Sequence, residues 1–220
     1  MECKNLPNHG YVEGVLKKSE REYLWSLIGD LDGLTEKNYG MRVSVQKQLE
    51  DKDNYFTNNV LMPYVQTYVN TYGIPFLTNT THSHDLCLNR FWARISKDGD
   101  YQSIHDHQSV FTFVIWLKIP FDGNKERNIQ PNFRPEAGDF CLVYTDTTGQ
   151  ILKKNWILTP ELEGTIIVFP SRINHIVYPH FTTDDYRVAV AGDVSLSSHN
   201  PLNEISVSYT HLTLPTSDLV

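Results

Sequence analysis

Residues 99–120 read GDYQSIHDHQSVFTFVIWLKIP. The apolar run from Val110 to Leu117 predicts a buried β-strand, because it is rich in aromatic and β-branched residues. Just before this run, His105 and His107 are two positions apart, and alternate residues of a strand point to the same face. The two imidazoles can therefore meet at one point while Asp106 faces away, which is the arrangement that a metal site needs.

A third histidine and an arginine follow later in the chain. His175 comes six positions after Phe169, and Arg187 lies twelve positions beyond His175. Three protein ligands leave coordination positions open for a substrate or for oxygen. We therefore predict that His105, His107 and His175 form a catalytic metal site with Arg187 nearby.

Composition limits the class of protein. The 220 residues are 40% hydrophobic and 12% aromatic, enough for a sizeable, β-rich core. The formal net charge of -7 disfavours nucleic-acid binding, because coating phosphates requires a basic surface. Three widely spaced cysteines favour neither a disulfide framework nor a cysteine zinc site, and no segment has the roughly 18 apolar residues that span a bilayer. We expect a cytoplasmic protein without a membrane partner.

Apolar spacing predicts helices before Leu86 and strands after it. Apolar residues recur every three to four positions from Ser19 to Leu31, with Ser19 and Glu22 as a capping pair, and again from about Asn58 to Tyr72. The polar segment 120–135 predicts a long loop at the mouth of a site. Short strands after two helices indicate a barrel or sandwich with helices on one side. The predicted strands are 88–95, 101–104, 110–119, 139–144, 165–169 and 186–194.

The order of these motifs resembles the iron(II)- and 2-oxoglutarate-dependent oxygenases. The resemblance covers about residues 86–194 and rests on GDYQSIHDH (99–107), GTIIVFPS (164–171), His175 and YRVAVAG (186–192). The likeness is greatest to a small group of these enzymes common in bacteriophages of marine bacteria. It implies a mainly β fold with flanking N-terminal helices, a double-stranded β-helix (jelly-roll, cupin-like). It also implies Fe(II) and 2-oxoglutarate as cofactors, and the cytoplasm of an infected bacterial host as the location.

The family's site residues carry over position by position. His105 would be the proximal histidine ligand and His175 the distal one. Arg187 would bind the far carboxylate of 2-oxoglutarate, since a guanidinium fork suits a carboxylate. Ala189 departs from the family pattern, which has a small hydroxyl residue two positions after the arginine, so one hydrogen bond to the cosubstrate is lost.

The carboxylate ligand is the larger departure. The widespread pattern is His-x-Asp, and here His107 occupies the third position, as in the His-x-His of the phage-type relatives. We predict an all-histidine set of His105, His107 and His175. The alternative is a bulge that turns Asp106 inward, since bulges re-aim side chains beside active sites.

The resemblance implies hydroxylation of a substrate with release of succinate and CO2. The partners would be 2-oxoglutarate, O2 and an unidentified substrate, with a peptidyl residue such as proline as the first guess. Two alternatives stay open, a cupin-type metal enzyme without 2-oxoglutarate and a non-catalytic phage β-sandwich binding module. Cupins place a glutamate soon after His-x-His, and residues 108–117 contain none. His82 and His84 share the spacing but have no partners, so we expect no site there.

The domain prediction follows from the extent of the resemblance. We expect one oxygenase domain over residues 1–206, with a helical lead-in at 1–85 and a jelly-roll core at 86–194. The tail at 207–220 contains VSYTHLTLPT, which looks like the translated sequencing adapter found at the ends of metagenomic reading frames. We expect this tail to be non-native; an ordinary C-terminal strand or tail is the alternative.

Overall fold

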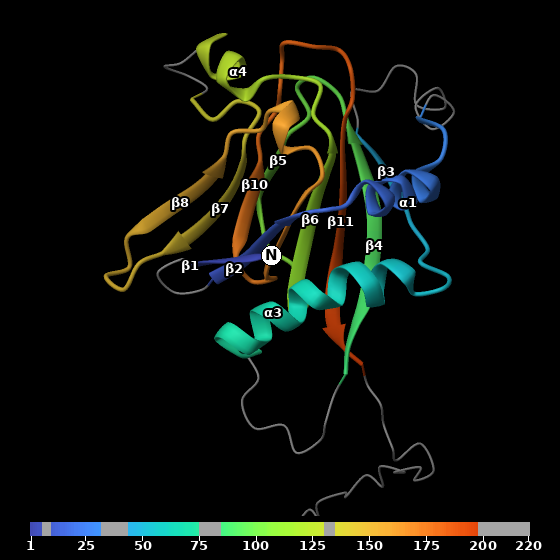
Figure 1. Cartoon of the computed structure of the whole chain (residues 1–220). Coiled ribbons are helices and arrows are strands. Elements are labelled where there is room, and N and C mark those ends of the chain that lie inside the picture. Colours follow the sequence, from blue (N-terminus) through green and yellow to red (C-terminus); the bar gives the residue numbers. More distant parts are fainter. Residues whose placement is uncertain (6–9, 32–43, 75–84, 130–134, 198–220) are drawn as a thin grey trace, which may run out of the picture.

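Two antiparallel sheets face each other in the computed structural model, which describes residues 1–5, 10–31, 44–74, 85–129 and 135–197 (Figure 1). The large sheet has the strand order β1 (Glu2–Asn5), β2 (Gly10–Val15), β9 (Thr165–Pro170), β6 (Phe111–Lys118), β11 (Arg187–Leu196), β4 (Leu86–Ser96) and β3 (Val45–Gln48). The small sheet has the order β5 (Gln102–His105), β10 (Asn174–Val177), β7 (Phe140–Thr145) and β8 (Ile151–Trp156). The predicted mainly β class with N-terminal helices, a double-stranded β-helix, is confirmed.

Helices cover the outer face of the large sheet. These are α1 (Lys18–Ile28) and α3 (Met62–Tyr72), the latter continuing from the π-helical turn η1 (Thr57–Leu61) (Figure 1). Alternation along β6 decides which side chains they meet. Phe111 and Phe113 belong to the core on the helix side, where Phe111 packs 5.0 Å from Tyr68 of α3. Trp116 points to the small sheet, and the centroid of its ring lies 5.8 Å from that of Phe140. Both faces of the central strands are therefore buried, which explains their unbroken apolar sequence.

The first helix begins one residue before the predicted start. The backbone N–H of Lys17 donates to Glu20 Oε2 at 2.8 Å, so Glu20 satisfies the helix end. The predicted capping pair of Ser19 and Glu22 is wrong, because Ser19 is already inside the helix. In the second helix, Pro63 lies in the first turn of α3, where its missing N–H does no harm.

The predicted loop at 120–135 contains the short helix α4 (Gly123–Ile129). Although the segment is polar, Phe121 and Glu126 within it are buried. Glu126 accepts hydrogen bonds from the backbone N–H groups of Phe181 and Thr182, at 2.8 and 2.9 Å. Its burial is possible because these donors replace water.

Other elements were not predicted from the sequence. The strands β1, β2 and β3 lie within the expected helical lead-in, and β8, β10 and the short 3-10 turn η2 (Pro160–Leu162) follow later. No helix in the described ranges is both long and apolar enough to cross a bilayer. His82, His84 and the tail at 207–220 lie outside the described residues. The division into one domain at 1–206 stays a prediction.

Candidate metal centre

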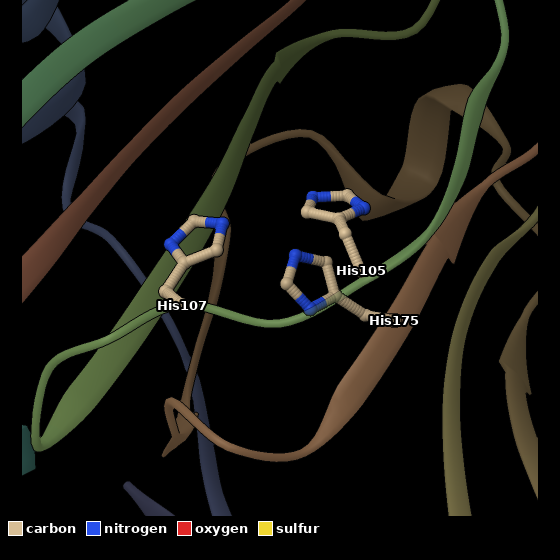
Figure 2. A group of neighbouring side chains, drawn as sticks. All are labelled: His105, His107 and His175. Carbon is tan, nitrogen blue, oxygen red and sulfur yellow. The ribbon is translucent and has the colours of Figure 1, made fainter.

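Three histidines converge between the two sheets. His105 ends β5 and is the direct cross-strand partner of His175 on β10. His107 lies two residues beyond β5, where its backbone N–H donates to the carbonyl of Ser171 at 2.9 Å. One ring nitrogen from each histidine lies within 4.8 Å of the others, and Figure 2 shows the three rings turned toward a common point. Such a group can hold one metal ion.

The hydrogen bonds of the rings decide which nitrogen is free. His105 Nδ1 lies 2.7 Å from the carbonyl oxygen of Ser103, and His175 Nδ1 lies 3.3 Å from that of Ile173. A carbonyl can only accept, so in each pair Nδ1 carries the proton. The lone pair is then on Nε2, which is the free ligand atom in a neutral imidazole. The donor set therefore fits a divalent ion that accepts imidazole ligands, Fe(II) among them.

His175 is also held in the neutral form. Burial lowers the pKa of His175 to about 3, and the neighbouring imidazoles of His105 and His107 add to the effect. Burial lowers the pKa of His105 as well. Neutral imidazole is the form that binds a metal, so at neutral pH these side chains need lose no proton before a cation enters.

Asp106 turns away from the three rings. Its carboxylate lies 3.2 Å from Arg172 Nη1, and both side chains are well exposed. The structure thus brings His107 into the cluster and leaves Asp106 outside it.

A buried carboxylate lies behind His107. Asp193 on β11 is fully buried, and its Oδ1 lies 2.6 Å from His107 Nδ1 and accepts from Thr112 Oγ1 at 2.9 Å. Arg90 Nε lies 2.8 Å from Oδ2, an ion-pair contact without hydrogen-bond geometry. Burial raises the pKa of Asp193, but the bonds from His107 and Thr112 and the charge of Arg90 outweigh it, so the net pKa is below its ordinary value. Asp193 is therefore ionised at neutral pH.

The three histidines and Arg187 line the same cavity. Arg187 is 3% exposed and donates from Nη1 to the carbonyl of Tyr178 at 3.0 Å. Within the described ranges it forms no ion pair with a carboxylate. Burial lowers the pKa of Arg187 to about 10, still far above neutral pH. A buried cation without a counter-ion is costly, and an anionic ligand in the cavity would supply the missing partner.

The cavity wall combines a few polar groups with a mostly apolar surface. Arg94 faces the cavity from β4, is paired with Asp100 at 3.2 Å, and has a buried Nε without a hydrogen-bond partner. Ala189 also lines the cavity, in keeping with its place beside Arg187 on β11. The apolar part is formed by Trp92, Val114, Trp116, Phe140, Leu158, Phe169 and Val177. A small charged ligand would thus be largely shielded from water.

Residues 90–193 match a family model described as "Putative 2OG-Fe(II) oxygenase". The match supports membership of the iron(II)- and 2-oxoglutarate-dependent oxygenase superfamily. The matched segment covers a little under half of the chain and includes all three histidines, Arg187 and Asp193. The family match and the three converging imidazoles indicate Fe(II) and 2-oxoglutarate as the cofactors.

Several solved structures are similar to this chain. A prolyl-4-hydroxylase from Pseudomonas putida shares 14% identity over 85% of this chain and 92% of its own, with a TM-score of 0.48. A prolyl hydroxylase from Trichoplax adhaerens, in complex with a hypoxia inducible factor peptide fragment, shares 12% identity over 87% of this chain and 84% of its own, with a TM-score of 0.49. A viral collagen prolyl hydroxylase from Paramecium bursaria Chlorella virus-1, in complex with 2-oxoglutarate, shares 13% identity over 84% of this chain and 94% of its own, with a TM-score of 0.44. No curated protein sequence matched the chain. All three TM-scores are below 0.5.

Proposed function

We propose that this protein is an Fe(II)- and 2-oxoglutarate-dependent dioxygenase that hydroxylates a substrate and releases succinate and CO2. Three converging imidazoles alone would suit several metal enzymes. The observation that carries the proposal is Arg187, a buried guanidinium that faces the same cavity as the histidines and has no carboxylate partner in the described parts of the chain. A dicarboxylate that chelates the metal at one end would meet Arg187 with the other.

Each side chain of the site has a defined task in this reaction. His105, His107 and His175 would hold the iron through Nε2, with coordination positions left open. When bound, the iron and 2-oxoglutarate supply the chemistry that splits O2 and oxidises a C–H bond. Arg187 orients the cosubstrate by binding its far carboxylate. The aromatic wall around Trp116 and Phe140 excludes water, which strengthens the charge pairing inside the cavity.

The other candidate functions have less support. A cupin-type metal enzyme without 2-oxoglutarate would use the three histidines but gives Arg187 no ligand. A non-catalytic β-sandwich module explains neither the convergence of three imidazole nitrogens nor the family match. Both remain outcomes of the experiment below.

The substrate is a narrower proposal. We propose a peptidyl residue, proline first, as the group to test. Kinship with oxygenases of marine bacteriophages, an origin in metagenomic sequence and action in the cytoplasm of an infected bacterium also stay predictions from the sequence.

The test is an oxygenase assay on a complex substrate pool. Purified protein, Fe(II), 2-oxoglutarate and O2 are incubated with a bacterial lysate and with proline-containing peptides. We expect succinate to be released and some products to become heavier by one oxygen atom, and we expect both signals to be lost in His175→Ala. Metal binding without 2-oxoglutarate turnover in any pool would support a binding module, and turnover independent of 2-oxoglutarate would support a cupin-type enzyme.

A further inference from the structure

The inward-facing residues of β11 place two opposite charges in the site. Alternate residues share one face of the strand, so Arg187, at its first position, lies on the same face as Ala189, Ala191 and Asp193. Arg187 faces the cavity as a buried cation, and Asp193 lies behind His107 as a buried anion. The strand thus brings a carboxylate to the metal centre that is itself no member of the histidine cluster.

The three imidazoles have different acceptors. His105 and His175 each donate from Nδ1 to the neutral carbonyl of the residue two positions earlier. His107 donates to the ionised carboxylate of Asp193, at the short distance of 2.6 Å. A charged acceptor forms a stronger hydrogen bond than a neutral one and raises the basicity of the opposite ring nitrogen. Of the three rings, His107 therefore has the shortest contact and the only carboxylate acceptor.

The surroundings of Asp193 fix its position. Thr112 Oγ1 lies 2.9 Å from Asp193 Oδ1 and 3.0 Å from Ser171 Oγ, and Ser171 Oγ lies 2.5 Å from Ser109 Oγ. This chain of hydroxyl groups holds Oδ1 in line with the His107 ring. The other carboxylate oxygen, Oδ2, has a charge contact with Arg90, whose side chain is about half exposed. An aspartate needed only to pair with Arg90 could remain at the surface, where a carboxylate is less costly than in the interior.

We propose that Asp193 is a positioning residue of the metal centre: its carboxylate fixes the His107 ring with Nε2 toward the metal and supplies the negative charge that an all-histidine ligand set lacks. The proposal rests on the proposed function, because it presumes that the three histidines bind a metal. The wider superfamily pattern has an aspartate as the third ligand. Here the carboxylate acts through one imidazole instead of contacting the metal.

The test measures metal binding with Co(II) as the probe, because Co(II) binds imidazole ligands and its visible spectrum reports their geometry. The variant is Asp193→Asn, which keeps the shape of the side chain and removes its charge. We expect the Kd for Co(II) to rise about ten- to a hundredfold, with a changed visible spectrum. We also expect Asp193→Glu, which restores the charge, to recover part of the affinity.

The matched control is Asp139→Asn. Asp139 is equally buried and paired with Arg127, and Asn155 Nδ2 donates to it at 2.9 Å, so it is a structural carboxylate away from the three rings. Asp139→Asn should lower the thermal stability of the metal-free protein while the Kd for Co(II) stays at the native value. A purely structural role for Asp193 would give this same pattern, a lower metal-free Tm with an unchanged Kd and spectrum, and would overturn the proposal.

Two further variants separate the possible failures. If Asp193→Asn does not fold, Thr112→Val decides, because it removes the hydroxyl that aligns Oδ1; a severalfold higher Kd supports the proposal and an unchanged Kd overturns it. His175→Ala tests the proposed function itself. Native protein that binds Co(II) no better than His175→Ala would refute the metal centre, whereas tight native binding that His175→Ala abolishes and Asp193→Asn leaves intact would refute only the role of Asp193.

Discussion

Single residues decide the chemistry of the cavity. Each imidazole of the cluster has its Nδ1 engaged by an oxygen atom, so the three Nε2 atoms are left for one ion. Arg187 gives the same cavity a buried positive charge. The three imidazole nitrogens suit a metal ion, and the guanidinium suits a carboxylate. The cavity therefore fits a metal ion together with a dicarboxylate that chelates it.

The choice between His107 and Asp106 can be tested directly. His107→Ala should weaken Fe(II) binding by more than about a hundredfold, because a ligand contributes more than the outer-shell groups whose loss costs 10- to 100-fold. Asp106→Asn should leave the affinity unchanged, since Asp106 pairs with Arg172 outside the cluster. Isothermal titration calorimetry with Fe(II) under anaerobic conditions measures the affinity of both variants. Weak binding by Asp106→Asn with normal binding by His107→Ala would show that the aspartate is the ligand.

Arg187 should contribute to cosubstrate binding and not to metal binding. Arg187→Gln is expected to raise the Kd for 2-oxoglutarate about ten- to a hundredfold, because charge-assisted hydrogen bonds contribute about 1.5–3 kcal/mol. The Kd for Fe(II) should stay the same. Lys118→Gln is the control for charge, since Lys118 pairs with Asp185 and does not line the cavity. Equal affinity of the native protein and Arg187→Gln for 2-oxoglutarate would remove Arg187 from the site.

The sequence contains more of the site than its motifs reveal. Arg187 stands out because a charge inside an apolar strand requires a partner, and Asp193, six positions later on the same face, carries the same signal. The contact between His107 and Asp193 is not predictable from local pattern. It depends on how β11 pairs with β6, where Asp193 lies opposite Thr112.

At the scale of elements, the long apolar strands were predictable and several of the short strands were not. The predicted strands at 110–119, 165–169 and 186–194 correspond to β6, β9 and β11, which are buried on both faces. The four-residue β10 is too short to show a period, and the lysines of β8 make that edge strand look like a loop. Tertiary pairing, not local propensity, forms these strands.

A buried carboxylate fastens the helix α4 to the loop that follows β10. Glu126 is fully buried and also accepts a hydrogen bond from the hydroxyl of Thr182, in the loop that connects β10 to Arg187. Glu126→Ala should lower the free energy of unfolding by about 2–3 kcal/mol, because two backbone N–H groups lose their acceptor. Urea unfolding measures the change.

The control for this prediction is Glu22→Ala on α1. Glu22 forms an exposed pair with Lys18, so its loss should change stability by about 0.5 kcal/mol or less. Equal losses in the two variants would mean that Glu126 does not fasten α4 to the loop.

For the whole molecule, the two-sheet arrangement buries titratable groups whose protonation opposes folding. His180 is fully buried, with its ring stacked 4.6 Å from that of Phe121. Burial lowers the pKa of His180, and the charge of Arg187 adds to this. Below pH 6.5 the unfolded chain therefore binds a proton that the folded protein resists, and stability falls as the pH falls.

This linkage predicts acid sensitivity of the metal-free protein. The free energy of unfolding should decrease by up to about 1.4 kcal/mol per pH unit for this group below pH 6.5, and His180→Phe should show a shallower decrease because it keeps the ring stack and removes the titration. Urea unfolding at several pH values, with a chelator present, gives both slopes. Identical slopes would show that His180 titrates normally in the folded state.

The central claim is that one cavity holds both Fe(II) and 2-oxoglutarate, and an anaerobic titration tests it without knowledge of the substrate. Fe(II)-loaded protein is titrated with 2-oxoglutarate while the visible charge-transfer absorption of the chelate is followed. The predicted result is a saturable band in the native protein and no band in His175→Ala. A native protein that binds Fe(II) and gives no band at any concentration of 2-oxoglutarate would contradict the account.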